Sequence, residues 1–93
     1  MREGHMKEIK VKIKNKLGLH ARPAAQLVKT AAKFKSDIFI SRDSQIVNGK
    51  SIMGVMMLAA ENGAELTIQA NGEDEDEALK ALAELFEKKF DEE

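Results

Sequence analysis

The 93-residue sequence predicts a single α+β domain, an open-faced β-sandwich in which a four-stranded antiparallel sheet carries three helices on one face, in the order βαββαβα. Three observations lead to this fold. Apolar and polar residues alternate in short segments, as in strands with one buried face. Other segments repeat apolar residues at helical spacing. Polar alternate positions leave one sheet face in water, whereas parallel sheets are buried on both faces.

The first strand and the first helix have the clearest patterns. Residues 1–5 are polar, and the Gly-His-Met order is typical of a leader left by cloning, so we expect the domain to span residues 6–93. Next, Ile9, Val11 and Ile13 alternate with lysines and predict a strand with one lysine-coated face. After a loop, helical spacing predicts a stripe comprising Ala24, Leu27, Val28, Ala31 and Ala32.

Two short strands and a short helix are predicted in the middle of the chain. Residues 37–41 and 45–48 are apolar runs separated by turn residues, which predicts a hairpin. Ser51 is expected to be the N-cap of the helix. The dipeptide Asn62-Gly63 is expected to mark the end of that helix.

The last strand and helix complete the order. Residues 65–71 alternate again and predict the fourth strand. The acidic run 73–77 predicts a solvated first helical turn matched to the helix dipole, in preference to a metal site. The apolar stripe of this helix is expected to comprise Leu79, Leu82, Phe86 and Phe90.

Size and composition exclude several classes of function. A chain of this length builds a lean core, so a deep, buried active site is not expected. The absence of cysteine excludes disulfides, thiolate zinc sites and cysteine nucleophiles. No apolar run reaches the roughly 18 residues of a membrane span, and no apolar secretory signal precedes the domain. We therefore expect a cytoplasmic protein without membrane insertion.

Charge is segregated along the chain. Residues 7–35 hold nine lysines or arginines against one acid, and residues 61–93 hold twelve acids against three lysines. The formal net charge is −1 and only 4% of residues are aromatic, which disfavours nucleic-acid binding. A local basic patch still suits an acidic protein or a single phosphoryl group.

His20 stands between the first strand and the first helix. A histidine at a helix N-terminus faces free N–H groups and the positive end of the dipole, which disfavour a cationic ring and keep a ring nitrogen nucleophilic. The same N–H groups bind anions, and Arg22 can add a forked donor to a phosphoryl group. Judged from these surroundings alone, a capping or surface histidine is the more frequent outcome.

The residues that a catalytic triad or a metal site would need beside His20 are missing from its segment. A triad needs an orienting carboxylate beside the histidine, and the only acid in residues 7–35 is Glu8. A metal site needs three or four ligands, which one histidine without cysteine does not supply. We therefore expect no metal and no cofactor, and His20 itself as the covalent acceptor of a group.

Two segments resemble one family. Residues 18–25, GLHARPAA, are similar to the phosphorylation signature of HPr, the histidine-containing phosphocarrier of the bacterial phosphoenolpyruvate:sugar phosphotransferase system. Residues 47–56, VNGKSIMGVM, resemble that family's regulatory-serine segment. The likeness runs from about residue 6 to residue 90, and the family's βαββαβα fold agrees with the order deduced from the residues.

The resemblance implies a role for each site residue. His20 would accept a phosphoryl group on Nδ1 from phosphorylated enzyme I and donate it to the IIA domains of sugar permeases, as a stoichiometric carrier and not an enzyme. Arg22 and the first amides of the helix would hold the phosphate oxygens. Leu17 departs from the small polar residue of several members, which leaves more of that task to the amides and Arg22. A monomer is expected.

Ser51 and the residues after it are expected to regulate and bind partners. Beyond its capping role, the resemblance implies that Ser51 is a regulatory phosphorylation site. In low-GC Gram-positive relatives this serine is the target of a serine kinase/phosphorylase, and the phosphoserine form binds a catabolite-control transcription factor. The following helix is apolar around more than one core face, so part of it should be exposed. Val55 and Leu58 are expected in the core. The docking surface for partners is expected to comprise Ala21, Arg22, Ile52, Met53 and Met56.

Two alternatives remain beside this interpretation. A protein of the same fold could serve a regulatory or nitrogen-related phosphorelay, although the intact His20 argues against relatives that retain only serine regulation. A small nucleic-acid-binding module would use the lysine face of the first strand. Its low aromatic content and near-zero net charge count against it.

Overall fold

A computed structural model describes residues 6–92 and has the predicted order of elements. The expected leader, residues 1–5, lies outside the described residues, as does residue 93. The elements are β1 Lys7–Lys12, α1 Ala21–Ala31, β2 Asp37–Arg42, β3 Gln45–Asn48, α2 Ile52–Met57, β4 Glu65–Asn71, α3 Glu75–Glu87 and a short final turn, η1 Lys89–Asp91.

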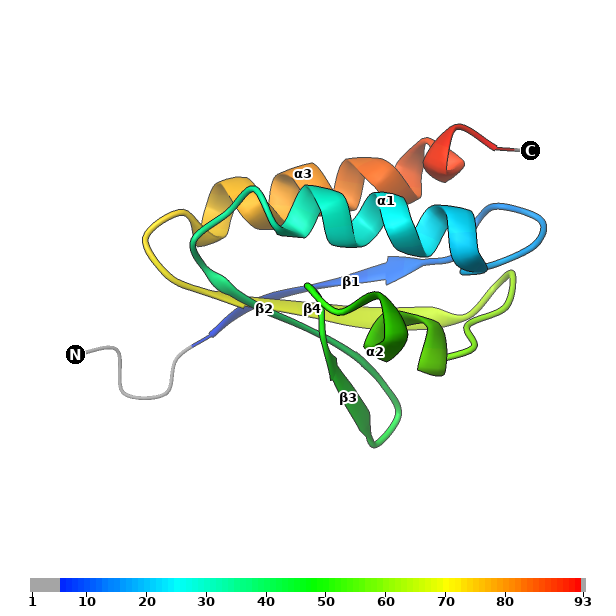
Figure 1. Ribbon diagram of the computed structural model, residues 1–93, viewed down its shortest axis with the longest axis horizontal. Helices are drawn as coiled ribbons and strands as arrows, with labels where there is room; N and C mark the ends of the chain where they lie inside the picture. The colour runs from blue at the N-terminus through cyan, green and yellow to red at the C-terminus, as the bar shows by residue number, and fades with distance from the viewer. Residues whose placement is uncertain (1–5, 93) are drawn as a thin grey trace.

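The four strands form one antiparallel sheet, as predicted, and their order in it is β1-β4-β2-β3. Ile68 of the central strand β4 lies opposite Ile9 of β1 on one side and Ile40 of β2 on the other. Figure 1 shows α1 and α3 side by side across one face of the sheet, with the shorter α2 near β3. The opposite face carries polar residues such as Lys10 and Thr67 and stays uncovered.

The core lies between the sheet and the helices. The inward positions of β2 and β4 are fully buried, and they are Ile38, Ile40, Leu66, Ile68 and Ala70. On β1, Ile9 and Val11 are only half-buried, because this strand forms an edge of the sheet, whereas Ile13 just beyond it is buried. Ala32, predicted on the first helical stripe, is exposed because α1 ends at Ala31.

Two helix ends differ from the prediction. α2 ends at Met57 and not near Asn62-Gly63, since Ala59 takes a φ of 48° that terminates the helix without a glycine. Phe90 does not lie on α3, which ends at Glu87. Phe90 lies in η1, where three successive non-glycine residues have φ values of 57°, 54° and 60°. It is nevertheless buried, at 1% exposure.

The acidic first turn of α3 is less solvated than predicted. Glu75 is buried, and its Oε1 accepts the N–H of Gly72 at 3.0 Å. Asp74 accepts the hydroxyl of Ser36 and the N–H groups of Lys35 and Ser36, which ties the start of α3 to the loop after α1. These hydrogen bonds lower the pKa of Asp74, and the bond from the Ser36 hydroxyl has the largest effect.

The structure places no metal-ligating cluster in this turn. Across residues 6–92, no three side chains of histidine, cysteine, aspartate or glutamate are grouped so that they could hold a metal ion. Within the same residues, no helix has the length and apolar character that crossing a membrane requires.

Candidate functional site

His20 stands at the N-terminus of α1 with its side chain free of the helix. It has an extended backbone (φ −79°, ψ −170°) and occupies the N-cap position, but its ring does not cap the helix. Its carbonyl accepts the N–H of Ala24 at 3.0 Å, the first bond of the helix. The imidazole is 37% exposed, so one part of the ring faces solvent and another faces protein.

The loop before His20 is held against the segment between α2 and β4. Gly18 has a φ of 73°, and a Cβ at this position would lie 2.5 Å from the carbonyl oxygen of Ala60, so only glycine fits. The next residue, Leu19, is buried and donates its N–H to the same carbonyl at 2.8 Å. These contacts fix the direction in which the chain enters α1 and therefore the position of His20.

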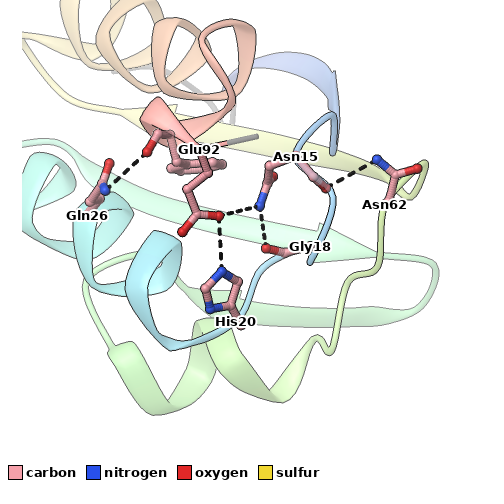
Figure 2. Close-up of polar contacts among 7 residues, drawn as sticks. Asn15, Gly18, His20, Gln26, Asn62 and Glu92 are labelled. Atoms are coloured by element: carbon pink, nitrogen blue, oxygen red, sulfur yellow. Dashed lines mark hydrogen bonds and ion pairs between the residues drawn. The ribbon is translucent and has the colours of Figure 1, made fainter.

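A carboxylate from the other end of the chain contacts the imidazole (Figure 2). Nε2 of His20 lies 3.0 Å from Oε1 of Glu92, and the same oxygen accepts a hydrogen bond from Nδ2 of Asn15 at 3.1 Å. Asn15 Nδ2 also donates to the carbonyl of Gly18 at 2.7 Å. Figure 2 shows Nδ1 of His20 turned away from Glu92, and no residue among 6–92 hydrogen-bonds to it.

These contacts keep Glu92 ionised. The hydrogen bond with His20 is the main cause that lowers the pKa of the Glu92 carboxyl, and the hydrogen bond from Asn15 and the charge of Arg22 act in the same direction. Partial burial opposes them. With its side chain 15% exposed, Glu92 is the better shielded partner of the pair.

The final turn η1 brings Glu92 to this position. Phe90 is buried in the core, and its carbonyl accepts a hydrogen bond from Nε2 of Gln26 on α1 at 3.3 Å (Figure 2). The N–H of Glu92 in turn donates to the carbonyl of Lys89 at 2.9 Å. The chain after α3 is therefore fixed to α1 immediately before Glu92.

Glu92 was not among the residues predicted from sequence. An orienting carboxylate was expected only in residues 7–35, whereas Glu92 is 72 positions from His20. Phe90 was the one available signal. This apolar residue stands among the C-terminal acids, and its burial in the core brings the acids that follow it close to the rest of the protein.

Arg22 and the first amides of α1 lie beside the ring. Arg22 is exposed and makes no hydrogen bond or ion pair with another residue among 6–92. Helical bonding begins at the N–H of Ala24, and Pro23 has no N–H, so the amides of Ala21 and Arg22 are left to bind a ligand. Two amides and one guanidinium can therefore meet an anion next to His20.

Ser51 is the N-cap of α2, as predicted. Its Oγ accepts the N–H of Gly54 at 3.1 Å. The preceding Lys50 does not face this hydroxyl with a free ammonium group, because its Nζ donates to the carbonyl of Phe34 at 2.7 Å.

The apolar side chains of α2 divide between core and surface. Val55 and Leu58 are buried, as predicted, whereas Ile52, Met53 and Met56 are 41%, 73% and 41% exposed. Met57 and Leu17 are also exposed, at 65% and 74%, although the predicted docking surface did not include them. A flexible, apolar and largely methionine-built surface thus follows Ser51.

The imidazole of His20 is partly exposed at the protein surface. Three surface hollows of about 400 to 450 Å³ lie along β1 or beside the turn between β2 and β3, and neither His20 nor Arg22 lines any of them. A partly exposed imidazole beside an exposed guanidinium and two helix-start amides suits transfer of a group between proteins. Fold and site together define a protein that carries a small anionic group.

Comparison with known proteins identifies the protein family. The family model described as "PTS HPr component phosphorylation site" matches residues 7–88. The phosphocarrier protein HPr of Xylella fastidiosa (strain Temecula1) is 51% identical over 87 residues, which cover 94% of this chain and 98% of the relative. The HPr-like protein Crh of Bacillus subtilis (strain 168) is 53% identical over 78 residues, 84% of this chain and 92% of the relative.

Solved structures agree with this assignment. A crystal structure of HPr-C-His from Thermoanaerobacter tengcongensis is 55% identical and superposes with a TM-score of 0.91, covering 95% of this chain and 99% of the other. A structure described as an HPr dimer from the same organism is 54% identical, with a TM-score of 0.74 and coverage of 91% and 98%. The chain belongs to the HPr family of phosphocarrier proteins of the phosphotransferase system.

Proposed function

We propose that His20 is the phosphoryl acceptor of this phosphocarrier. Its Nδ1 takes the group from phosphorylated enzyme I, and the IIA domains of sugar permeases remove it. The observation that carries the proposal is the environment of the ring, in which Nε2 contacts Glu92 while Nδ1 points away from it and hydrogen-bonds to no residue among 6–92. A nucleophile that serves two protein partners in turn has to be accessible to both.

The phosphate oxygens are expected to bind at the start of α1. The Nδ1 lone pair forms the N–P bond, while the bond between phosphorus and the donor breaks and its electron pair stays with the donor. The amides of Ala21 and Arg22 and the Arg22 guanidinium stabilise the oxygens during the transfer. His20 is regenerated when the group passes on, so the protein acts as a stoichiometric carrier and not as an enzyme, and uses no cofactor of its own.

The docking surface comprises Ala21, Arg22, Ile52, Met53 and Met56. All five are exposed, so a partner covering them would also cover the anion-binding amides. Methionine side chains adapt to differently shaped partners. A carrier that binds both enzyme I and several IIA domains requires such adaptability. We place the carrier in the cytoplasm as a monomer, because one chain holds every residue of the proposed site.

Ser51 is proposed as a regulatory phosphorylation site. Its half-buried hydroxyl lies immediately before Ile52 and Met53, so a phosphate there would add roughly −1.5 to −2 charges at the edge of the docking surface. Nζ of the neighbouring Lys50 donates to the carbonyl of Phe34 and keeps its positive charge, so it would offset part of that charge. A serine kinase/phosphorylase would place the group, and a catabolite-control transcription factor would recognise it.

The decisive experiment supplies phosphoenolpyruvate, enzyme I and Mg²⁺ and follows the intact mass of the carrier. The wild type should gain one acid-labile phosphoryl group, and none when enzyme I is omitted. The variant His20→Ala should gain none. Equal labelling of the wild type and His20→Ala would contradict the assignment of His20.

A further inference from the structure

We infer that Glu92 is a positioning residue for phosphoryl transfer at His20, an inference that rests on the function proposed above. The carboxylate keeps a hydrogen on Nε2, which leaves the lone pair of the neutral ring on Nδ1. It also balances the positive charge that the ring acquires when Nδ1 bonds to phosphorus. The aspartate of a serine-protease triad orients a histidine in the same manner, although there the histidine is a base and here it is the nucleophile.

The first step is the tautomer of the His20 ring. An ionised carboxylate can only accept hydrogen bonds, so the 3.0 Å contact with Oε1 of Glu92 requires a hydrogen on Nε2 of His20. A neutral imidazole holds one hydrogen, and its lone pair must then lie on Nδ1. The contact therefore selects the ring nitrogen that can attack phosphorus.

The second step is orientation. Asn15 Nδ2 donates both to Glu92 and to the carbonyl of Gly18, two residues before His20. Asn15 is completely buried, so the carboxylate and the loop that positions the ring are held by one rigid side chain. The ring is thus held from its Nε2 side, while Nδ1 faces away from the carboxylate (Figure 2).

The third step is the charge of the ring during transfer. When the Nδ1 lone pair forms the N–P bond, the proton on Nε2 stays in place and the ring becomes a cation beside the Glu92 carboxylate. When the group leaves for the next acceptor, the electron pair of the N–P bond returns to Nδ1, and the ring is again neutral with its proton on Nε2. No proton has to enter or leave, so transfer can run in both directions without a separate base.

The backbone supports this assignment. The residues that carry the chain to Glu92 all have positive φ values, although none is glycine: Lys89, Phe90 and Asp91. Such conformations are costly and persist where tertiary contacts fix them, commonly at functional sites. Burial of Phe90 and the hydrogen bond from Gln26 supply those contacts here.

Three variants separate the roles of the carboxylate. Glu92→Ala removes both the acceptor and the charge, and Glu92→Gln keeps an acceptor oxygen but not the charge. Asp91→Asn is the matched control, because it removes the adjacent charge, which pairs with Lys88 at 3.6 Å and does not contact His20. For each variant, we would measure the initial phosphorylation rate with enzyme I and phosphoenolpyruvate, and the His20 tautomer by ¹⁵N NMR at a pH where the ring is neutral.

The inference predicts different results for these variants. Glu92→Ala should slow phosphorylation on the order of three- to tenfold, the effect of losing one partly exposed charge-assisted hydrogen bond, and should mix the two tautomers. Glu92→Gln should be slowed less and should keep the hydrogen on Nε2. Asp91→Asn should match the wild type in rate and tautomer.

Two outcomes would overturn the inference. One is a wild-type rate and tautomer in Glu92→Ala, and the other is a faster rate, which would mean that the carboxylate obstructs the ring. If Glu92→Ala does not fold, Glu92→Asp takes its place, and a wild-type rate in that shortened variant likewise overturns the inference. Phosphorylation of His20→Ala would instead contradict the proposed acceptor, so the two failures are distinguishable.

Discussion

Phe90 packs edge-on against Phe86, with ring centroids 4.9 Å apart and an interplanar angle of 69°, although the helix that carries Phe86 has already ended at Glu87. The left-handed turn after α3 returns the chain to the core at this point. Two residues later, Glu92 reaches His20. Packing in the core and the geometry of the site are therefore linked through the last turn of the described chain.

Replacing Phe90 by alanine tests this link. The variant should lose about 3 to 5 kcal/mol of unfolding free energy, the usual cost of truncating a buried aromatic ring. It should also release Glu92 from His20. Urea denaturation measures the first effect and ¹⁵N NMR of His20 the second. Phe34→Ala, at a half-buried ring, is the control and should cost less and leave the His20 contact intact. A destabilised Phe90 variant that keeps the Glu92 contact of His20 would contradict the link.

Arg22→Ala should slow phosphoryl transfer by about tenfold or more while changing stability by no more than about 0.5 kcal/mol. The reason is that the Arg22 side chain is exposed and makes no hydrogen bond or ion pair among residues 6–92. Arg22→Lys should recover part of the rate, since it keeps the charge but not the forked donor. Thermal melting gives the stability change. A steep fall in melting temperature with normal transfer per folded molecule would make Arg22 structural.

Met53→Glu or Met56→Glu should weaken binding to enzyme I and to a IIA domain by about 1 kcal/mol or more, as expected for a central interface residue. Folding should persist because both side chains are exposed. Thr67→Glu introduces the same charge on the uncovered sheet face and is the matched control. Calorimetric affinities equal to that control would place the two methionines outside the interface.

Ser51→Asp should stay folded and receive phosphate from enzyme I more slowly than the wild type, and kinase-treated protein more slowly still. Its negative charge would face any acidic partner that docks over Ile52 and Met53. Ser51→Ala removes the hydrogen bond to Gly54 and should cost about 1 kcal/mol of stability without slowing transfer. Equal initial rates for the wild type, Ser51→Asp and kinase-modified protein would leave Ser51 with a capping role alone.

The carboxyl of Glu92 should titrate below the ordinary glutamate range, because its hydrogen bond with His20 lowers its pKa. A pKa that is lower in the folded than in the unfolded state means that the contact contributes stability above the unfolded pKa and loses it as pH falls through the folded one. In His20→Ala, the Glu92 pKa should rise toward its usual value, as followed by carboxyl ¹³C shifts. Glu61, whose pKa is lowered by a backbone hydrogen bond and Arg42, should titrate unchanged in that variant.

Local patterns predicted most of the fold. The strand predicted over residues 65–71 has those bounds in β4, because its alternation of apolar and polar residues reflects one buried and one open face. The candidate site at the start of α1 was proposed from sequence for a similar reason. The ring of His20, the guanidinium of Arg22 and the free amides all belong to one short segment.

What sequence reasoning missed depends on tertiary contacts. The left-handed conformations of Ala59 and of residues 89–91 end helices without a glycine. The local sequence therefore contains no residue that predicts these helix ends. Glu92 acquires its place from the burial of Phe90, not from its neighbours in sequence. Asp74, expected to be a solvated helix-start residue, instead anchors Ser36 on a distant loop.

The uncovered face of the sheet offers a way to handle the molecule in experiments. Thr67 lies between Lys10 and Ser41 on the neighbouring strands, and it faces away from the helices because its neighbours Leu66 and Ile68 point into the core. The chain contains no cysteine, so Thr67→Cys would introduce a unique thiol. Attachment of that thiol to a sensor surface would orient every molecule with α1 toward the solution. Enzyme I and a IIA domain could then be passed over the same immobilised carrier in succession.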